Sequence, residues 1–315
     1  MKRFIAVVMI LLLLGLAGCG IGNSAPDKLV VTYVKSPLNV PTMVEKSLGI
    51  FADTFDDYGI TVEYANITNG SEQTQALASG DVQFLFAVGA PSVILAAANG
   101  ADIQVIGAYS SSPKAYQIVT GNDDIQSAAD LKGRTVAGPK GTTLNELLVA
   151  YLAEDGVSVE EVNYLSMSIS DAQAALEAGQ VDAALLAGTN AYLAGQAGYR
   201  VLADGEGLID GTVLVAAGGT FCERYPELVE AFLGAHQEVL AYMEQNPDTA
   251  LEIAAAETGL DLQAVDTISR YYQFHSELTQ QDIASIQKTM QFMLDNGMIE
   301  QAIDAQAVIY QPKAD

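Results

Sequence analysis

The chain has 315 residues, of which 50% are hydrophobic and 17% are charged, so it is long and apolar enough for a large buried core. It carries 39 acidic and 14 basic residues, a formal net charge of −25. That excess of negative charge argues against nucleic acid and anionic lipid surfaces as partners. A small anion remains compatible with it, because local N–H groups act at closer range than a diffuse surface charge.

The first 27 residues are typical of an exported lipoprotein. Two basic residues precede an apolar run that is too short for a comfortable membrane span. A Leu-Ala-Gly-Cys sequence ending at Cys19 then resembles the bacterial lipobox, in which the chain is cut before a cysteine that receives lipid. We predict a signal peptide over residues 1–18, lipidation of Cys19 and a flexible tether over residues 19–27. A plain signal peptide with a chance cysteine is the alternative.

A lipid on Cys19 would hold the mature protein at the extracytoplasmic face of the cell membrane, without a spanning helix. The remaining cysteine, Cys222, then has no partner for a disulfide within the mature chain, and we expect a buried thiol. The two histidines, His236 and His275, are not in a metal-ligand spacing. Catalytic motifs are absent from the sequence as well, so we predict no enzyme activity, no metal and no cofactor.

The first part of the chain alternates strands with helices. This order predicts a mainly parallel sheet with helices on both faces, and ligands bind such sheets outside the carboxyl ends of the strands. The loops at those ends include Ser36, Pro37, Leu38, Asn69, Gly70, Ser71, Val88, Gly89, Ala90, Tyr109 and Ser110. The expected strands are 28–35, 60–64, 82–88 and 102–109, and the expected helices are 42–48 (continued to 58 after Gly49), 72–78 and 92–99.

A second α/β unit follows, and the stretches 71–84 and 170–183 share one order of capped helix, Gly turn and strand. We predict lobe 1 over residues 28–116, lobe 2 over 117–215, and a return to lobe 1 with C-terminal helices over 216–315. Two lobes with facing loops enclose a cleft, and two crossings form a hinge. The expected elements are strands 115–120, 135–137, 162–165, 181–186, 200–202 and 212–216, with 116–120 and 212–216 as the crossing strands, and helices 143–154, 171–178, 191–196, 226–245, 247–258, 261–272 and 280–296.

The loop before the helix at residue 143 is a candidate anion site. Gly141 belongs to a Gly/Pro loop, Thr142 or Thr143 can cap the helix, and Glu146 is placed to complete a capping box with Thr143. A helix start presents free N–H groups and a partial positive charge to an anion. An ordinary strand-to-helix turn is the alternative. The other lobe 2 loops that follow strands contain Ser168, Gly188 and Asn190.

Several motifs, in order, resemble those of the substrate-binding proteins of ABC importers, in the branch for sulfonates, taurine and nitrate. They are Gly49-Ile-Phe51, Ser79-Gly-Asp-Val82, Gly89-Ala-Pro91, Lys132-Gly-Arg-Thr-Val136, Pro139-Lys-Gly-Thr-Thr143, Asp171-Ala-Gln-Ala-Ala-Leu176 and Gly179-Gln-Val-Asp-Ala183. The resemblance implies a type II periplasmic-binding-protein fold, with two Rossmann-like lobes that close over a ligand. It also implies a monomer that docks on an ABC permease. The implied ligand contacts fall on Ser36, Pro37, Gly70, Ser71, Gly89, Ala90, Ser110, Thr142 and Thr143.

The sequence departs from the family at residues 187–189. Many relatives place a Trp, an acidic residue and a Pro there, whereas this chain has Ala187-Gly188-Thr189. The lost bulk suggests a different or larger ligand. Tyr109, Tyr116 and Tyr192 are candidates for a stacking surface, with core or rim packing as the alternative.

The sequence therefore predicts a binding protein that captures a small organic anion, most simply an aliphatic sulfonate. Backbone N–H groups and hydroxyls at helix starts suit sulfonate oxygens. A neutral aromatic or pyrimidine-like ligand, an enzyme of the same fold and a ligand-sensing module are the alternatives. The predicted ligand-binding set is Ser36, Pro37, Leu38, Asn69, Gly70, Ser71, Val88, Gly89, Ala90, Tyr109, Ser110, Gly141, Thr142, Thr143, Ser168, Gly188 and Asn190.

Overall fold

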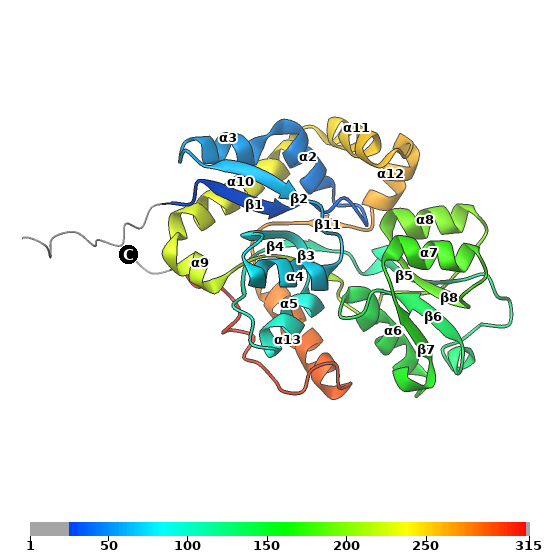
Figure 1. The fold of residues 1–315 in the computed structure, drawn as a ribbon. Coiled ribbons are helices and arrows are strands. Elements are labelled where there is room, and N and C mark those ends of the chain that lie inside the picture. The colour runs from blue at the N-terminus through cyan, green and yellow to red at the C-terminus, as the bar shows by residue number, and fades with distance from the viewer. Residues whose placement is uncertain (1–24, 313–315) are drawn as a thin grey trace, which may run out of the picture.

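The computed structural model describes residues 25–312 (Figure 1). The predicted signal peptide and Cys19 lie outside the described residues. Among the described residues, no helix has the length and apolar character needed to cross a bilayer.

Two β-sheets organise the chain, and each is the centre of one lobe (Figure 1). The six-stranded sheet of the first lobe has the order β11-β4-β10-β3-β1-β2, and the five-stranded sheet of the second lobe has the order β7-β6-β8-β5-β9. The strands are β1 Lys28–Thr32, β2 Thr61–Ala65, β3 Phe84–Gly89, β4 Gln104–Ser111, β5 Tyr116–Thr120, β6 Thr135–Gly138, β7 Asn163–Ser166, β8 Ala183–Ala187, β9 Arg200–Asp204, β10 Thr212–Ala217 and β11 Gln273–Phe274.

Helices cover both faces of each sheet, which confirms the predicted α/β class. In the first lobe α2, α3, α10 and α11 pack together on one side, and α5 and α13 pack on the other. The helices are α2 Val40–Leu48, α3 Ile50–Asp56, α4 Gly70–Ser79, α5 Ala90–Ala98, α6 Thr143–Glu154, α7 Ile169–Glu177, α8 Gly188–Gln196, α9 Gly219–Arg224, α10 Pro226–Gln245, α11 Pro247–Thr258, α12 Leu262–Ser269 and α13 Gln280–Asp295.

Both sheets are mixed, although the sequence predicted mainly parallel pairing. β1 runs parallel to β2 and β3, and β6 runs parallel to β7 and β8. β10, however, is antiparallel to β3 and β4, and β5 is antiparallel to β8 and β9. Each of these two strands follows a passage between the lobes, so it enters its sheet from the opposite end.

The passages between the lobes are residues 112–115 and 205–211, not the strands predicted to cross. β5 lies wholly in the second sheet, and β10 lies wholly in the first. We therefore place the return to the first lobe before β10, whereas the predicted boundary at residue 215 cuts this strand. α9 and β11 were not predicted from the sequence, and the helix that ends at Ser269 was predicted to extend to residue 272.

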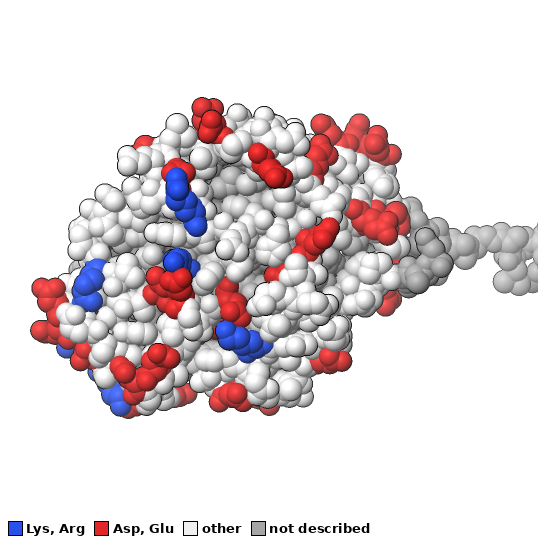
Figure 2. Space-filling view, turned by 180° about the vertical axis from the view of Figure 1, so that it is seen from behind, with Lys and Arg blue, Asp and Glu red and all other residues white. Residues whose placement is uncertain are grey.

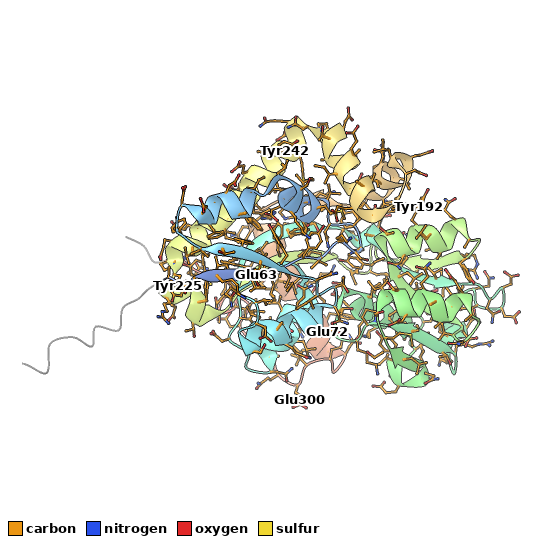
Figure 3. The ribbon with its side chains drawn as sticks, turned by 45° about the horizontal axis from the view of Figure 1, so that its top comes forward. Glu63, Glu72, Tyr192, Tyr225, Tyr242 and Glu300 are labelled. Carbon is orange, nitrogen blue, oxygen red and sulfur yellow. The ribbon has the colours of Figure 1, made fainter. Side chains whose placement is uncertain are left out.

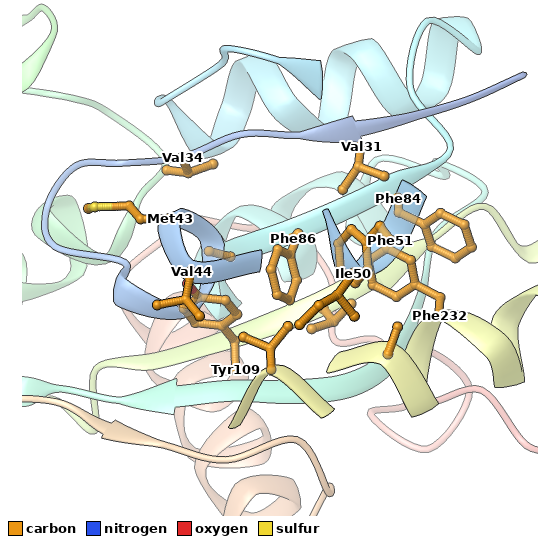
Figure 4. Packing of buried hydrophobic residues seen from close by; sticks show 14 of the residues in the cluster. Val31, Val34, Met43, Val44, Ile50, Phe51, Phe84, Phe86, Tyr109 and Phe232 are labelled. Atoms are coloured by element: carbon orange, nitrogen blue, oxygen red, sulfur yellow. The ribbon is translucent and has the colours of Figure 1, made fainter. Parts of the chain in front are cut away.

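Aromatic side chains join the C-terminal helices to the first sheet (Figure 4). Phe232 of α10 is fully buried, and its ring stacks on Phe84 of β3 with a centroid distance of 4.1 Å. The same ring lies 4.4 Å from Phe51 of α3 and 5.7 Å from Phe86 of β3. The segment after β10 is therefore part of the first lobe's core.

Two residues considered for chemistry lie in this core. His236 of α10 packs its ring edge-on against Phe86, and burial lowers its pKa to about 3, so it is neutral at physiological pH. Cys222 of α9 is buried, and burial raises the pKa of its thiol to about 12. The prediction of a buried thiol at Cys222 is confirmed.

Replacing Phe232 with Ala should lower the free energy of unfolding by about 3–5 kcal/mol, because it empties the centre of this cluster. Urea unfolding of the variant and the parent protein measures the loss. Tyr58→Ala is the control, because Tyr58 is an aromatic residue with 44% exposure and should change stability by only about 0.5 kcal/mol. Equal losses for the two variants would contradict the assignment of Phe232 to the core.

Candidate ligand-binding site

A cavity of about 160 Å³ lies between the two lobes. That volume is below the roughly 300–1,000 Å³ of pockets for drug-sized molecules, so it suits a small ligand. The first lobe lines it with Val34, Ser36, Pro37, Asn39, Thr68, Asn69, Gly70, Gln73, Ala87, Gly89, Ser92 and Val213, and the second with Tyr116, Pro139, Thr142, Thr143, Leu144, Ser168, Ile169 and Ser170.

The structure brings part of the predicted site together. Eight of the predicted residues line the cavity: Ser36, Pro37, Asn69, Gly70, Gly89, Thr142, Thr143 and Ser168. Four others, Ser71, Gly141, Gly188 and Asn190, lie where the lobes contact each other beside it. The remaining five, Leu38, Val88, Ala90, Tyr109 and Ser110, are buried within the first lobe. Tyr109, for example, bonds its hydroxyl to Thr42 at 2.8 Å in the core.

Other residues of the lining were missed, among them Gln73, Ser92 and Tyr116. Gln73 and Ser92 lie in the first turns of α4 and α5, a few positions after the loops that were predicted. Side chains on a helix tilt toward its N-terminus, so residues in the first turn can face the same cleft as the loop before it. The helical period could therefore have identified Gln73 and Ser92 from the sequence. Tyr116 is a candidate stacking residue in the sequence but is not part of the predicted ligand-binding set.

Four helices begin at the cavity, and this is its main electrostatic feature. α4, α5, α6 and α7 are preceded by Asn69, Gly89, Thr142 and Ser168, and all four of these residues line the cavity. Each helix start carries a partial positive charge and N–H groups that lack a partner within the helix. The convergence of four such starts is an arrangement that favours an anion.

Two of these helix starts lack a side-chain cap. Asn69 caps α4 and Ser168 caps α7 through their side-chain oxygens. Among the described residues, no side chain caps α5 after Gly89 or α6 after Thr142. The Thr142 hydroxyl donates instead to the Pro139 carbonyl at 2.9 Å. The N–H groups that open α5 and α6 are therefore the best placed to meet a ligand.

The predicted capping box at α6 is wrong. Thr142 is the N-cap residue, and Thr143 is the first residue of the helix. Glu146 does not turn back to the cap; it is buried and hydrogen-bonded with Thr289 of α13. Tertiary packing against α13 has replaced the local pairing that the sequence pattern predicted.

Small residues let the two uncapped helix starts approach each other. A Cβ atom on Gly89 would lie 2.6 Å from Oγ1 of Thr143 across the cleft, closer than real Cβ contacts. The Thr143 side chain is also hydrogen-bonded with the Tyr116 hydroxyl. Gly89 is therefore needed for the close contact between the first and the second lobe.

The lobes also bond directly on both sides of the cavity. On one side Ser92 donates to the Gly141 carbonyl at 2.8 Å, and Ser71 donates to the same oxygen at 3.3 Å. On the other side the backbone N–H and the hydroxyl of Thr189 donate to the Pro37 carbonyl at 3.0 and 2.9 Å. The structure therefore shows the lobes in contact, closed over the cavity.

Tyr192 of α8 adds an apolar contact between the lobes. Its half-buried side chain packs against the first lobe's core cluster, and Figure 3 shows it at the side of α8 that faces the first lobe. It does not line the cavity. The structure thus favours the packing alternative for Tyr192 over ligand stacking.

Ala87 shapes the first-lobe wall. Its φ of 77° is unusual for a residue other than glycine, and the register of β10 shifts beside it, between Leu214 and Val215. Its carbonyl accepts a bond of 3.4 Å from the Gln73 amide, which also lines the cavity. Such backbone strain costs about 1–3 kcal/mol and clusters at functional sites.

The cavity wall is uncharged although the protein is strongly acidic. Within residues 25–312, no Asp, Glu, Lys, Arg or His lines the cavity. Figure 2 shows acidic side chains scattered over one outer face with fewer basic ones between them. The described residues also hold no group of three or more His, Cys, Asp or Glu that could bind a metal ion. Polar contacts to a ligand in the cavity would therefore come from N–H groups, hydroxyls, amides and carbonyls.

Comparison with known proteins agrees with this geometry. The family model described as "NMT1/THI5 like" matches residues 39–250. The chain belongs to the NMT1/THI5-like family. It is 28% identical to a putative aliphatic sulfonates-binding protein of Bacillus subtilis, over 98% of this chain and 95% of that protein. It is also 26% identical to the formylaminopyrimidine-binding protein of Halalkalibacterium halodurans, over 80% of this chain and 78% of that one.

The fold has a solved counterpart. The alkanesulfonate-binding protein SsuA from Xanthomonas axonopodis pv. citri, bound to MOPS, superposes with a TM-score of 0.83. The match covers 90% of this chain and 98% of that one, at 23% identity. The predicted periplasmic-binding-protein fold and the resemblance to sulfonate-binding proteins of ABC importers are confirmed.

Gly188→Ala should push the lobes apart, because its Cβ would lie 2.5 Å from the Pro37 carbonyl oxygen. We expect a larger radius of gyration than in the parent protein, measured by small-angle X-ray scattering. Gly198→Ala is the matched control. Gly198 also has a positive φ, and no described atom outside its immediate neighbours lies within 4 Å of its would-be Cβ. Equal radii for all three proteins would contradict a close contact at Gly188.

Proposed function

We propose that this protein is the solute-binding component of an ABC importer and that it captures an aliphatic sulfonate between its two lobes. The observation that carries the proposal is the convergence of four helix starts on a small, uncharged, hydroxyl-lined cavity. A sulfonate is a monoanion that accepts hydrogen bonds and donates none. Its oxygens match a wall of N–H and O–H donors without a buried cation.

The apolar part of the wall suits the carbon chain of such a ligand. Val34 and Val213 of the first lobe and Leu144 and Ile169 of the second all line the cavity. Burial of an alkyl group contributes about 0.8 kcal/mol for each CH₂. The small cavity volume favours a short chain. In this proposal the protein binds its ligand and does not transform it, in agreement with its relatives named as binding proteins.

The cellular location proposed for this function follows from the lipoprotein signal predicted at the N-terminus. We propose that the mature protein is a monomer held to the extracytoplasmic face of the membrane by lipid on Cys19. The closed, ligand-loaded form would then dock on a membrane permease. A ligand favours the closed form only by its higher affinity for that form, which here comes from contacts with both lobes at once.

A neutral pyrimidine-like ligand is the second candidate. It is supported by the relative named for formylaminopyrimidine and by the Tyr116 ring in the cavity wall. The same hydroxyls and amides that suit an anion can also bond a heterocycle. The two candidates differ in charge, so one ligand panel separates them.

Ethanesulfonate should raise the melting temperature of the mature protein, whereas a formylaminopyrimidine should not. Binding to the folded state alone stabilises it by about 2.7 kcal/mol at a ligand concentration of 100 times the Kd. Differential scanning fluorimetry measures the shift. Stabilisation by the pyrimidine alone would replace the sulfonate proposal with the second candidate.

Thr143→Val should weaken ethanesulfonate binding by about 1–3 kcal/mol, because it removes a hydroxyl at the α6 start without changing the side chain's shape. Isothermal titration calorimetry measures the affinity. Thr54→Val is the control, since Thr54 is a threonine on α3, away from the cavity, whose hydroxyl donates to the Ile50 carbonyl. Unchanged affinity in Thr143→Val would mean that this loop is only a structural turn.

A further inference from the structure

Glu146 is a carboxyl group buried between the two lobes, outside the cavity. It lies on α6 of the second lobe and is only 4% exposed. Its side chain is hydrogen-bonded with Thr289 of α13, which belongs to the first lobe and is equally buried. The contact therefore joins an element of each lobe, one turn after the α6 start that lines the cavity.

α13 bridges the two lobes at this point. Ile286 and Met293 on α13 belong to a core cluster of the first lobe, and Phe292 packs against the main core cluster of the second. Movement of the lobes about residues 112–115 and 205–211 must therefore shift α6 relative to α13. Such a shift would expose Glu146 to water.

The charged groups that face Glu146 do not neutralise it. They are Asp210, in the passage between the lobes, and Lys288 of α13. The Lys288 ammonium lies 3.1 Å from Asp210 Oδ1 and is paired with that carboxylate. Tyr116 of β5 is the other titratable group that interacts with Glu146, and burial keeps its hydroxyl protonated. An ionised Glu146 in the closed form would therefore be desolvated without a cation of its own.

We propose that Glu146 is a proton-linked positioning residue, which holds the lobes closed when it is protonated and favours opening when it is ionised. The inference rests on the proposed ligand-binding function. Glu146 acts through α6, because the first turn of that helix carries Thr143 into the cavity and Glu146 fixes the same turn against α13. It does not touch the ligand.

The direction of the pH effect follows from burial. Burial raises the pKa of Glu146 from 4.5 to about 7 in the closed form, whereas hydration on opening returns the pKa toward its ordinary value. The closed form thus binds more protons than the open form between these two values. The contribution of the Glu146 proton to closure is complete below the lower pKa and is lost as the pH rises through the upper pKa. Between the two values the equilibrium constant for closure falls by up to about tenfold per pH unit.

The test is ethanesulfonate affinity against pH, by calorimetry in bis-Tris and Tris buffers, because sulfonate buffers are themselves candidate ligands. Ethanesulfonate keeps one charge throughout, so any pH dependence belongs to the protein. Affinity of the parent protein should fall as the pH rises from about 4.5 to about 7 and then level off, with proton uptake on binding within that range.

Three variants separate a proton-linked role from a purely structural one. Glu146→Gln keeps the shape and a hydrogen bond to Thr289 but cannot ionise, so its affinity should stay high and flat with pH. Asp210→Asn frees Lys288 to pair with Glu146 and should reduce the fall in affinity. Glu154→Gln, the same change at an exposed position of α6, should keep the parent profile.

A ligand-free measurement separates this inference from the proposed function. The radius of gyration of the parent protein, from small-angle X-ray scattering, should rise over the same pH range, whereas that of Glu146→Gln should not. Parallel pH profiles for the parent protein and Glu146→Gln in both measurements would overturn the inference. Absence of ethanesulfonate binding at every pH would overturn the proposed ligand, and the scattering profiles alone would then decide the role of Glu146.

Discussion

The structure depends on one electrostatic constraint, the meeting of helix starts from two separate sheets. α4 and α5 begin at the cavity from the first lobe, and α6 and α7 begin there from the second. Like partial charges face each other across the closed cleft, which opposes closure until something negative lies between them. A bound anion would remove that repulsion and accept hydrogen bonds from the free N–H groups at the same time. Ligand binding would then favour lobe closure.

Packing in the surrounding fold fixes the positions of these helix starts. The aromatic cluster around Phe232 fixes β3 and α10 in the first lobe, so the start of α5 at the end of β3 has a rigid base. Gly89 and Gly188 allow backbone and side chains of opposite lobes to come within bonding distance. The full chain has a net charge of −25, but no charged residue within 25–312 lines the cavity. In the proposed function, the selectivity of the site would therefore be set by short-range donors and not by the overall field.

Much of the fold was predictable from the sequence, because strands and helices alternate with clear Gly, Pro and Ser signals between them. The helices at residues 226–245 and 247–258 were predicted to the residue, since a proline starts each one. β11 was missed because it has two residues and exists only through its pairing with β4. The direction of β5 and β10 was missed because it depends on how the chain passes between lobes.

The site was predictable at its loops and not beyond them. Gly70, Gly89 and Thr142 were predicted because they lie between a strand end and a helix start, and all three line the cavity. Tyr109 and Ser110 were predicted because they also lie at a strand end, but they are buried in the core. Local sequence shows where a loop is, but only tertiary packing decides which loop residues face the cleft. Glu146 shows the same limit, because a capping-box spacing was overruled by a partner on α13 that is more than a hundred residues away in sequence.

A crystal structure of the mature protein grown with ethanesulfonate would test the central claim most directly. The account predicts a closed molecule with the sulfonate oxygens against the N–H groups that open α5 and α6, and with the ethyl group toward Val213 and Ile169. Sulfonate bound elsewhere, or a closed cleft that holds a neutral molecule in preference to it, would contradict the account.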